Sequence, residues 1–208
     1  MHVDIILFDG FDTLDAIGPF EVFGHARSMG APLEISLVTV ESQSSVHSSH
    51  GLEVVPDGFL TRVGDDDSLR IERSPALVIV PGGGWRVEDG GVRQQVSDGR
   101  LPSLMRDLHR AGSTIASVCT GAMVLAEAGL TDGRPAITHR SAIDDLRDSG
   151  AEIVDSRVVD DGDLVTAGGI TAGIDLALHL LEREFDEELS TSVAAVMEYE
   201  AQGSAYQT

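Results

Sequence analysis

Apolar residues along the chain fall into two patterns, short continuous runs of strand length and longer stretches with helical spacing. A run that is apolar throughout, such as Ala76 to Val80, is typical of a parallel strand buried on both faces. The strands predicted from such runs, together with one alternating segment, are 3–8, 33–40, 76–80 and 114–118. Helices are predicted at 15–29, 101–111, 120–128, 141–149 and 172–185, and in a last stretch that reaches Tyr199.

Two further segments have the glycine-centred pattern of hairpins. One is a short hairpin or arm at 46–55, and the other places an Asp-Gly turn between the apolar pairs of 158–165. Strands that alternate with helices imply a single α/β domain, with a mostly parallel sheet and helices on both faces. Sites in such sheets lie beyond the carboxyl ends of the strands. We therefore expect the segment around Asp15, the 81–84 turn and Cys119 to converge.

The charge of the chain narrows the classes of partner. There are 35 acidic against 14 basic side chains, a formal net charge of -21, and every basic residue is an arginine. Such a charge repels phosphate backbones and anionic lipids, so we expect neither nucleic-acid nor membrane-surface binding. The long apolar runs exclude disorder. The excess carboxylates are expected at the surface, because their clusters at 65–67, 144–145, 160–161 and 182–188 fall on predicted turns and outer helix faces. The composition resembles that of proteins from salt-accumulating halophiles, with an arginine-rich bacterium of high GC content as the alternative.

Hydropathy and cysteine usage predict a cytoplasmic protein. Residues 1–8 lack a basic leader followed by a long apolar segment, and nowhere do about 18 apolar residues run together. Cys119 is the one cysteine, which excludes an internal disulfide framework and a multi-cysteine metal site. It is either inert packing or a reactive thiol.

No pattern in the chain predicts a metal or a cofactor. The Asp65-Asp-Asp67 run lies in a polar connection and is interpreted as surface, with a cation site as the alternative. His47 and His50 would point to opposite faces of an extended segment, which argues against a metal pair. Gly168-Gly169 lacks the pattern of a phosphate loop and indicates tight packing between strand and helix. We interpret His179 as a packing residue of its helix.

The segment Ala116-Ser-Val-Cys-Thr-Gly-Ala122 carries the candidate chemistry. An apolar strand meets a helix there, with Cys119 at the junction among small residues, which is the form of a nucleophile elbow. The N–H groups and the dipole of the helix N-terminus would lower the pKa of the thiol. A buried structural cysteine is the alternative.

The segment around Cys119 belongs to an ordered set of motifs that extends over most of the chain. They are Leu14-Asp-Ala-Ile-Gly-Pro19, Glu21-Val-Phe23, Pro81-Gly-Gly83, Ser117-Val-Cys-Thr-Gly121, Leu125-Ala-Glu-Ala-Gly-Leu130, Thr138-His139, Gly168-Gly-Ile-Thr-Ala-Gly-Ile-Asp175 and Met197-Glu-Tyr199. The ordered set resembles the ThiJ/PfpI superfamily, and within it the isonitrile hydratase branch. The resemblance implies one class I glutamine amidotransferase-like domain over residues 1–208, folded as a flavodoxin-like three-layer sandwich, and a homodimer that uses no cofactor.

The resemblance also implies roles for individual residues. Cys119 would be the nucleophile, and Asp15 the acidic residue hydrogen-bonded to it. The backbone N–H groups of Gly83 and Thr120 would form an oxyanion donor pair, and the Thr120 hydroxyl would fix a water molecule or the substrate. Asp15 beside a thiolate is a like-charge pair, so one of the two should hold a proton at neutral pH. The alternative for Asp15 is an N-cap of the following helix.

These roles predict a hydratase that converts isonitriles to N-substituted formamides. Thr120 stands where peptidase-like members of the superfamily have a histidine, which argues against proteolysis. Arg140 stands where enzymes of the hydratase branch have an aromatic residue, so the pocket wall is altered.

Two alternative functions use the same residues. One is a glyoxalase- or deglycase-like activity on small 2-oxoaldehydes, in which His139 would relay protons; a structural role for His139 is equally compatible with the sequence. The other is a redox or stress sensor that responds through Cys119. A fused helix-turn-helix regulator is disfavoured, because only nine residues follow Tyr199.

Overall fold

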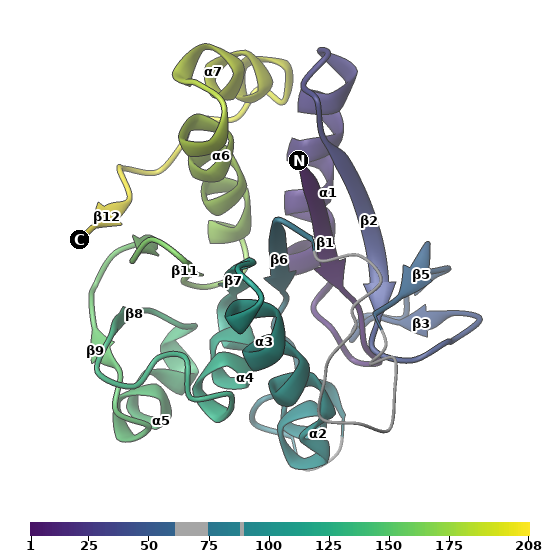
Figure 1. Ribbon diagram of the computed structural model, residues 1–208, viewed down its shortest axis with the longest axis vertical. Coiled ribbons are helices and arrows are strands. Elements are labelled where there is room, and N and C mark those ends of the chain that lie inside the picture. Colours follow the sequence, from purple (N-terminus) through teal and green to yellow (C-terminus); the bar gives the residue numbers. More distant parts are fainter. Residues whose placement is uncertain (61–74, 88–89) are drawn as a thin grey trace.

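The computed structural model describes residues 1–60, 75–87 and 90–208 of the chain (Figure 1). Its strands are β1 (His2–Ile6), β2 (Glu34–Thr39), β3 (Val46–His47), β4 (Glu53–Val54), β5 (Gly58–Phe59), β6 (Leu77–Val80), β7 (Thr114–Val118), β8 (Pro135–Ala136), β9 (Glu152–Ile153), β10 (Val158–Asp160), β11 (Leu164–Ala167) and β12 (Tyr206–Gln207). Its helices are α1 (Thr13–Ser28), α2 (Gly91–Asp98), α3 (Arg100–Arg110), α4 (Ala122–Glu127), α5 (Ile143–Asp148), α6 (Ala172–Glu184) and α7 (Glu187–Val196). Short 3-10 turns, Cys119–Gly121 and Arg140–Ala142, precede α4 and α5.

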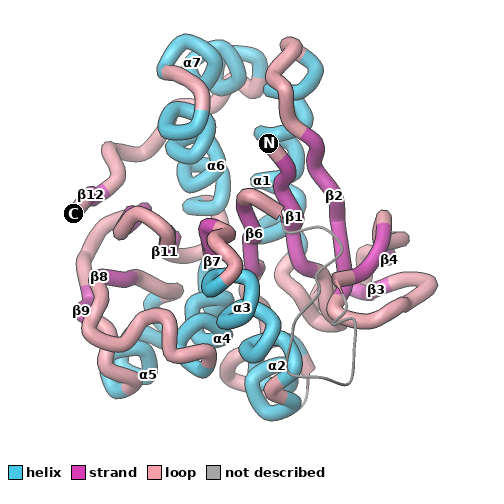
Figure 2. The backbone as a smooth tube through the Cα atoms, viewed as in Figure 1, coloured by secondary structure: helices cyan, strands magenta, loops and turns pink. Residues whose placement is uncertain are grey.

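A mostly parallel sheet forms the centre of the fold. Its order is β12-β10-β11-β7-β6-β1-β2-β5, and only the pair β10 and β11 runs antiparallel among the described strands of this sheet. The helices pack in two groups, α1 with α6 and α7, and α2 with α3 and α4. Figure 2 shows the central strands between these two groups. The predicted fold class, helices on both faces of a mostly parallel sheet, is confirmed.

The apolar runs predict the main strands correctly. The run 76–80 contains β6, a central strand in which every residue is buried. The two predicted hairpins are also present, since β3 pairs antiparallel with β4 and β10 pairs antiparallel with β11. Within the described ranges, none of the helices combines the length and the apolar character needed to cross a bilayer.

Elements with weak hydrophobic patterns were not predicted. Helix α2 has the polar sequence GVRQQVSD and buries only Gly91 and Val92, so its apolar spacing carries no helical signal. The strands β5, β8, β9 and β12 have two residues each, too few for a periodic pattern. The short strands form by pairing with other strands of the chain, and α2 packs against α3 and α4.

The excess carboxylates lie largely on the surface, with one correction. The acidic residues of 182–188 are exposed, as predicted. Asp160 was also expected at the surface, but it is only 5% exposed and lies 2.7 Å from Nε2 of His179. Burial alone would raise its pKa, yet the hydrogen bond with His179 and the charge of Arg183 hold the pKa of Asp160 below its ordinary value. His179 therefore has a polar partner besides its packing. The 65–67 run lies outside the described residues.

Candidate functional site

The segments that follow β1, β6 and β7 meet at the carboxyl edge of the sheet. These strands are neighbours in the order β7-β6-β1. The backbone N–H of Gly82 donates to Oδ2 of Asp15 at 2.9 Å, and that of Gly83 donates to Oγ1 of Thr120 at 3.0 Å. The predicted convergence of the three segments is therefore confirmed.

Cys119 occupies a sharp turn between β7 and the helical segment that follows. Its φ of 57° lies in the left-handed region, which a residue with a side chain adopts only when its surroundings hold it there. Its N–H donates to the carbonyl of Gly168 at 2.8 Å, and its carbonyl accepts the hydroxyl of Thr138 at 2.8 Å. The side chain is buried, with 6% exposed. This geometry matches the predicted nucleophile elbow.

Two glycines permit the close approach of the three segments. A Cβ atom on Gly82 would lie 2.7 Å from the backbone nitrogen of Thr120 and 2.8 Å from Oδ2 of Asp15. A Cβ atom on Gly121 would overlap the carbonyl oxygen of Val80. No other residue fits at either position without moving backbone, so these motif glycines keep the acid and the elbow together.

Asp15 is fully buried in the first turn of α1. The N-cap of this helix is Asp12, which accepts the N–H of Leu14 at 3.3 Å, so the capping interpretation of Asp15 is wrong. Burial and the charge of Asp12 raise the pKa of Asp15 to about 8, against the opposing hydrogen bonds with Gly82 and Cys119. Its Oδ1 receives no hydrogen bond from a described backbone or hydroxyl group. At neutral pH the carboxyl group is therefore mostly protonated.

The thiol of Cys119 is protonated as well. Burial and the neighbouring Asp15 raise its pKa to about 12, although the backbone N–H groups of Ile170 and Thr120 face the sulfur and oppose the rise. The predicted lowering of the thiol pKa is therefore wrong. Helix α4 has only six residues and follows a 3-10 turn. Its dipole therefore stabilises the thiolate by less than burial destabilises it. Both members of the pair, rather than one, hold a proton.

The backbone donors around the sulfur differ from the expected pair. The N–H of Gly83 already donates to the Thr120 hydroxyl oxygen, which disfavours Gly83 as an oxyanion donor. The N–H groups that face the sulfur are those of Thr120 and Ile170. Ile170 has an unusual φ of 32°. Sequence reasoning missed it because a backbone donor has no side-chain signature, and the preceding Gly168-Gly169 pair was its only signal.

His139 stands near this loop with its ring engaged elsewhere. Its Nδ1 lies 2.9 Å from Oγ of Ser141 and accepts the N–H of Ser141 at 3.2 Å, which caps the short turn that follows. Its Cδ2 packs so close to Gly169 that a Cβ there would lie 2.7 Å away. In the described part of the chain, no hydrogen bond joins His139 to Cys119 or Asp15. These contacts favour a structural role over a proton relay.

The other histidines singled out by the sequence do not form a common site. The ring of His47 lies 3.9 Å from Oδ1 of Asp9, whereas the ring of His50 lies 3.1 Å from Oγ of Ser49. Among residues 1–60, 75–87 and 90–208, no three His, Cys, Asp or Glu side chains are arranged to hold a metal ion.

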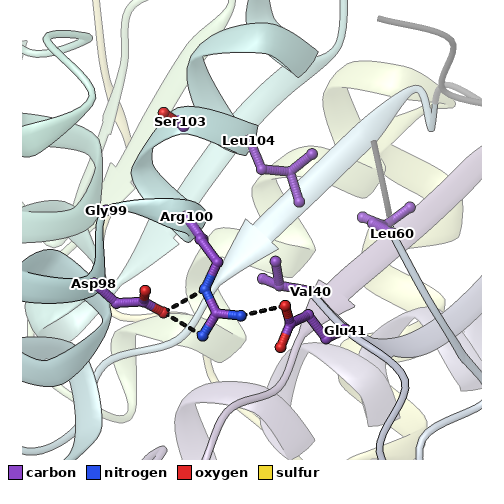
Figure 3. A pocket seen from close by; sticks show the side chains of 8 residues that line it. All are labelled: Val40, Glu41, Leu60, Asp98, Gly99, Arg100, Ser103 and Leu104. Atoms are coloured by element: carbon purple, nitrogen blue, oxygen red, sulfur yellow. Dashed lines mark hydrogen bonds and ion pairs between the residues drawn. The ribbon is translucent and has the colours of Figure 1, made fainter. Parts of the chain in front are cut away.

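Cavities near the carboxyl edge of the sheet include the following two. One, of about 440 Å³, surrounds Arg100 between the end of β2 and the start of α3 (Figure 3). The guanidinium there is held between Asp98 and Glu41, and the cavity contains none of the predicted site residues. The other, of about 790 Å³, is lined by His139 and by the 168–172 loop, whose backbone contacts Cys119.

Comparisons with known proteins agree with this geometry. Residues 1–183 match the model of the DJ-1/PfpI family. Isonitrile hydratase of Pseudomonas putida is 33% identical over 201 residues, which cover 96% of this chain and 78% of that protein. The HTH-type transcriptional regulator CdhR of Pseudomonas aeruginosa is 30% identical, over 91% of this chain and 52% of the regulator.

Solved structures show the same fold. A ThiJ/PfpI family protein from Pseudomonas syringae has a TM-score of 0.81 and 27% identity, over 97% of this chain and 76% of that one. Schizosaccharomyces pombe DJ-1 has a TM-score of 0.78 and 19% identity, over 96% of this chain and 100% of that one, a likeness of fold alone. The relatives include enzymes and transcriptional regulators. Fold, motifs and site together lead to one conclusion: the chain belongs to the DJ-1/PfpI family.

Proposed function

We propose that the protein is a cofactor-free hydratase that converts isonitriles to N-substituted formamides. The observation that carries the proposal is the buried pair of the Cys119 thiol and the protonated Asp15. The terminal carbon of an isonitrile must receive both a nucleophile and a proton, so a catalyst needs the two groups at one point. The similarity to isonitrile hydratase of Pseudomonas putida supports the same chemistry.

The first step forms a thioimidate. The sulfur of Cys119 attacks the terminal carbon while the carboxyl of Asp15 delivers a proton to that carbon, and the thiol proton replaces it on the carboxyl group. A C–S bond and a C–H bond form, and the S–H bond breaks. The carboxyl group is neutral before and after the step, which suits a site where burial disfavours charge.

The second step releases the product. A water molecule adds to the thioimidate carbon, a proton reaches the nitrogen through Asp15, and the C–S bond breaks as the thiol is restored. The product is an N-substituted formamide, and the sum of the steps is the addition of one water. The Thr120 oxygen already accepts the N–H of Gly83, so its hydroxyl hydrogen can be donated to the water oxygen.

The same geometry weakens the two alternative functions. A glyoxalase- or deglycase-like reaction would use His139 as a relay, but its Nδ1 is engaged with Ser141. An oxidation sensor needs an accessible thiol of low pKa, whereas Cys119 is 6% exposed and its pKa is raised.

The resemblance and the composition further support a homodimer that acts in the cytoplasm of an organism with high internal salt. The net charge of -21 fits molar salt, where charge repulsion is screened within about 3 Å. Analytical ultracentrifugation in low and high salt measures the dimer directly.

The decisive experiment follows product formation from an alkyl isonitrile by NMR, with methylglyoxal as a parallel substrate. Wild-type protein is expected to form the formamide, and Cys119→Ala to form none. Cys119→Ser is the matched control, because it keeps the size of the side chain and removes the sulfur. Lactate without formamide would instead support the 2-oxoaldehyde reaction, and absence of both products would refute the hydratase.

A further inference from the structure

Arginine side chains in this chain are almost all committed to partners. Most of those described bind a carboxylate, a carbonyl oxygen or a hydroxyl, as Arg134 does with Asp161 at 2.5 Å and Arg147 with Asp144 at 2.6 Å. Three arginines, Arg27, Arg110 and Arg140, have no side-chain hydrogen bond or ion pair within the described ranges. All three side chains are exposed to solvent.

Helix position explains two of these three residues. Arg27 lies in the last turn of α1 and Arg110 in the last turn of α3, where the helix dipole favours a cation. Arg140 has no such position, because it lies in the short turn that precedes α5. Its side chain is exposed, and in the described part of the molecule neither a hydrogen bond nor an ion pair holds its guanidinium.

Arg140 lines the cavity of about 790 Å³ that borders the Cys119 loop. Two lining residues contact the nucleophile, since the carbonyl of Gly168 accepts the N–H of Cys119 at 2.8 Å and the N–H of Ile170 faces its sulfur. The cavity also has apolar surface, contributed by Ile137, Ile143 and Ile170. The cavity and the nucleophile therefore share the 168–172 loop, which lines the cavity and contacts Cys119.

Of the two arginines that line this cavity, Arg140 is the one whose guanidinium makes no hydrogen bond or ion pair with a described residue. The other arginine, Arg157, is bound to Asp175 at 2.6 Å and to the Thr171 hydroxyl at 3.1 Å. Asp155 is the carboxylate among the described lining residues, and it is exposed. Since the whole molecule carries -21 and repels anions, a local guanidinium is what would allow an anion to approach the site.

We propose that Arg140 binds a carboxylate group of the substrate. The planar guanidinium matches a carboxylate with two parallel hydrogen bonds, and the isoleucines of the lining accept a short apolar linker. The proposal places the reacting carbon at Cys119, beyond the 168–172 loop. The substrate class is therefore an isonitrile that bears a carboxylate. The nature of the reacting group rests on the proposed function, whereas the anionic group rests on Arg140 alone.

The first test is independent of enzymatic activity. Cys119 is alkylated with iodoacetate and, separately, with iodoacetamide, and the ratio of the two rates reports the local charge. Arg140→Gln is expected to lower this ratio about threefold, and Asp155→Asn to raise it. Arg110→Gln removes the same charge at the opposite edge of the sheet, before β7, and should leave the ratio unchanged. An unchanged ratio in Arg140→Gln would overturn the proposal.

The second test compares isocyanoacetate with its methyl ester as substrates. The wild-type kcat/KM should favour the carboxylate, and Arg140→Gln should lower this preference about tenfold, with Arg140→Lys between the two. A preference that is the same in wild type and Arg140→Gln contradicts the inference. If neither isonitrile is hydrated while the alkylation ratio still depends on Arg140, the hydratase fails and the anion site stands.

Discussion

Two buried carboxylates, Asp15 and Asp160, show how the same group acquires opposite properties in one molecule. Asp15 is 0% exposed and faces a backbone N–H and a thiol, and burial with the charge of Asp12 raises its pKa to about 8. Asp160 is 5% exposed, but hydrogen bonding to His179 and the charge of Arg183 outweigh its burial and lower its pKa. A carboxyl group buried without a counter-ion keeps its proton at neutral pH, whereas one buried beside cations stays ionised.

The largest expected effect is a difference in the rate of formamide formation between variants of the two carboxylates. Asp15→Asn keeps the shape of the side chain but removes the acidic proton, so formamide formation should fall about a thousandfold. Asp160→Asn, a matched change at the far side of the sheet, should keep wild-type kcat. Initial rates with an alkyl isonitrile measure both. Equal losses in the two variants would mean that Asp15 acts only through the fold.

The next effect concerns stability as a function of pH. The pKa of Asp15 is raised from 3.8 to about 8, so the folded state holds its proton more tightly and the stability from this group is lost as pH rises between those values. Wild-type protein should lose about 1.4 kcal/mol per pH unit in this window relative to Asp15→Asn. Urea unfolding at about pH 5 and about pH 8 measures the difference. Parallel pH profiles would show that Asp15 is already ionised in the fold.

The pH dependence of stability that Asp160 contributes is expected to be opposite to that of Asp15, and the Asp160→Asn variant tests it. The substitution removes the buried anion shared by His179 and Arg183, and Arg183 then keeps only Glu184 as an anionic partner among the described residues, so the free energy of unfolding should fall by about 2 kcal/mol near neutral pH. The difference should shrink as pH falls through the lowered pKa of Asp160, since the wild-type carboxylate is then protonated as well. A variant as stable as wild type at every pH would mean that the cluster contributes nothing.

The pH dependence of the rate sharpens the contrast further. The proposed first step needs the protonated carboxyl of Asp15, so kcat/KM should decline above about pH 8 with a slope approaching tenfold per unit. Asp160→Asn should leave the position of this decline unchanged. A rate that rises through the same range would assign Asp15 as a base instead.

The smallest effect at the site is expected from salt. The net charge of -21 lies mainly on exposed residues, so molar salt should raise the urea midpoint of unfolding. The rate at which neutral iodoacetamide alkylates Cys119 should change little, because its pKa is set by burial and by Asp15. Equal unfolding midpoints in low and high salt would remove the interpretation of the composition as salt adaptation.

The sequence alone predicts the central strands and the meeting of the three site segments, because both follow from local patterns. The apolar run at β6 has no alternative to burial, and parallel strands bring their carboxyl ends to one edge. Polar helix α2 and the two-residue strands lack such a pattern and form through distant contacts.

The electrostatics of the site could not be predicted in the same way. Cys119 at a strand-to-helix junction indicates a lowered pKa, and only the structure reveals that the helix is short and that Asp15 is buried beside the sulfur. The direction of the Ile170 N–H toward the sulfur likewise cannot be predicted from a sequence. Local signals identify which groups meet, whereas burial and backbone direction decide what the groups do.

The N-cap residue Asp12 provides a way to change the pKa of Asp15 from outside the buried pair. Its side chain holds the first turn of α1, and its charge contributes to the raised pKa of Asp15. Serine and asparagine cap a helix nearly as well as aspartate but carry no charge. One substitution at a partly exposed position can therefore change the pKa of Asp15 while the elbow, the glycines and the sulfur stay in place, which offers evolution a simple way to move the pH range over which Asp15 holds its proton.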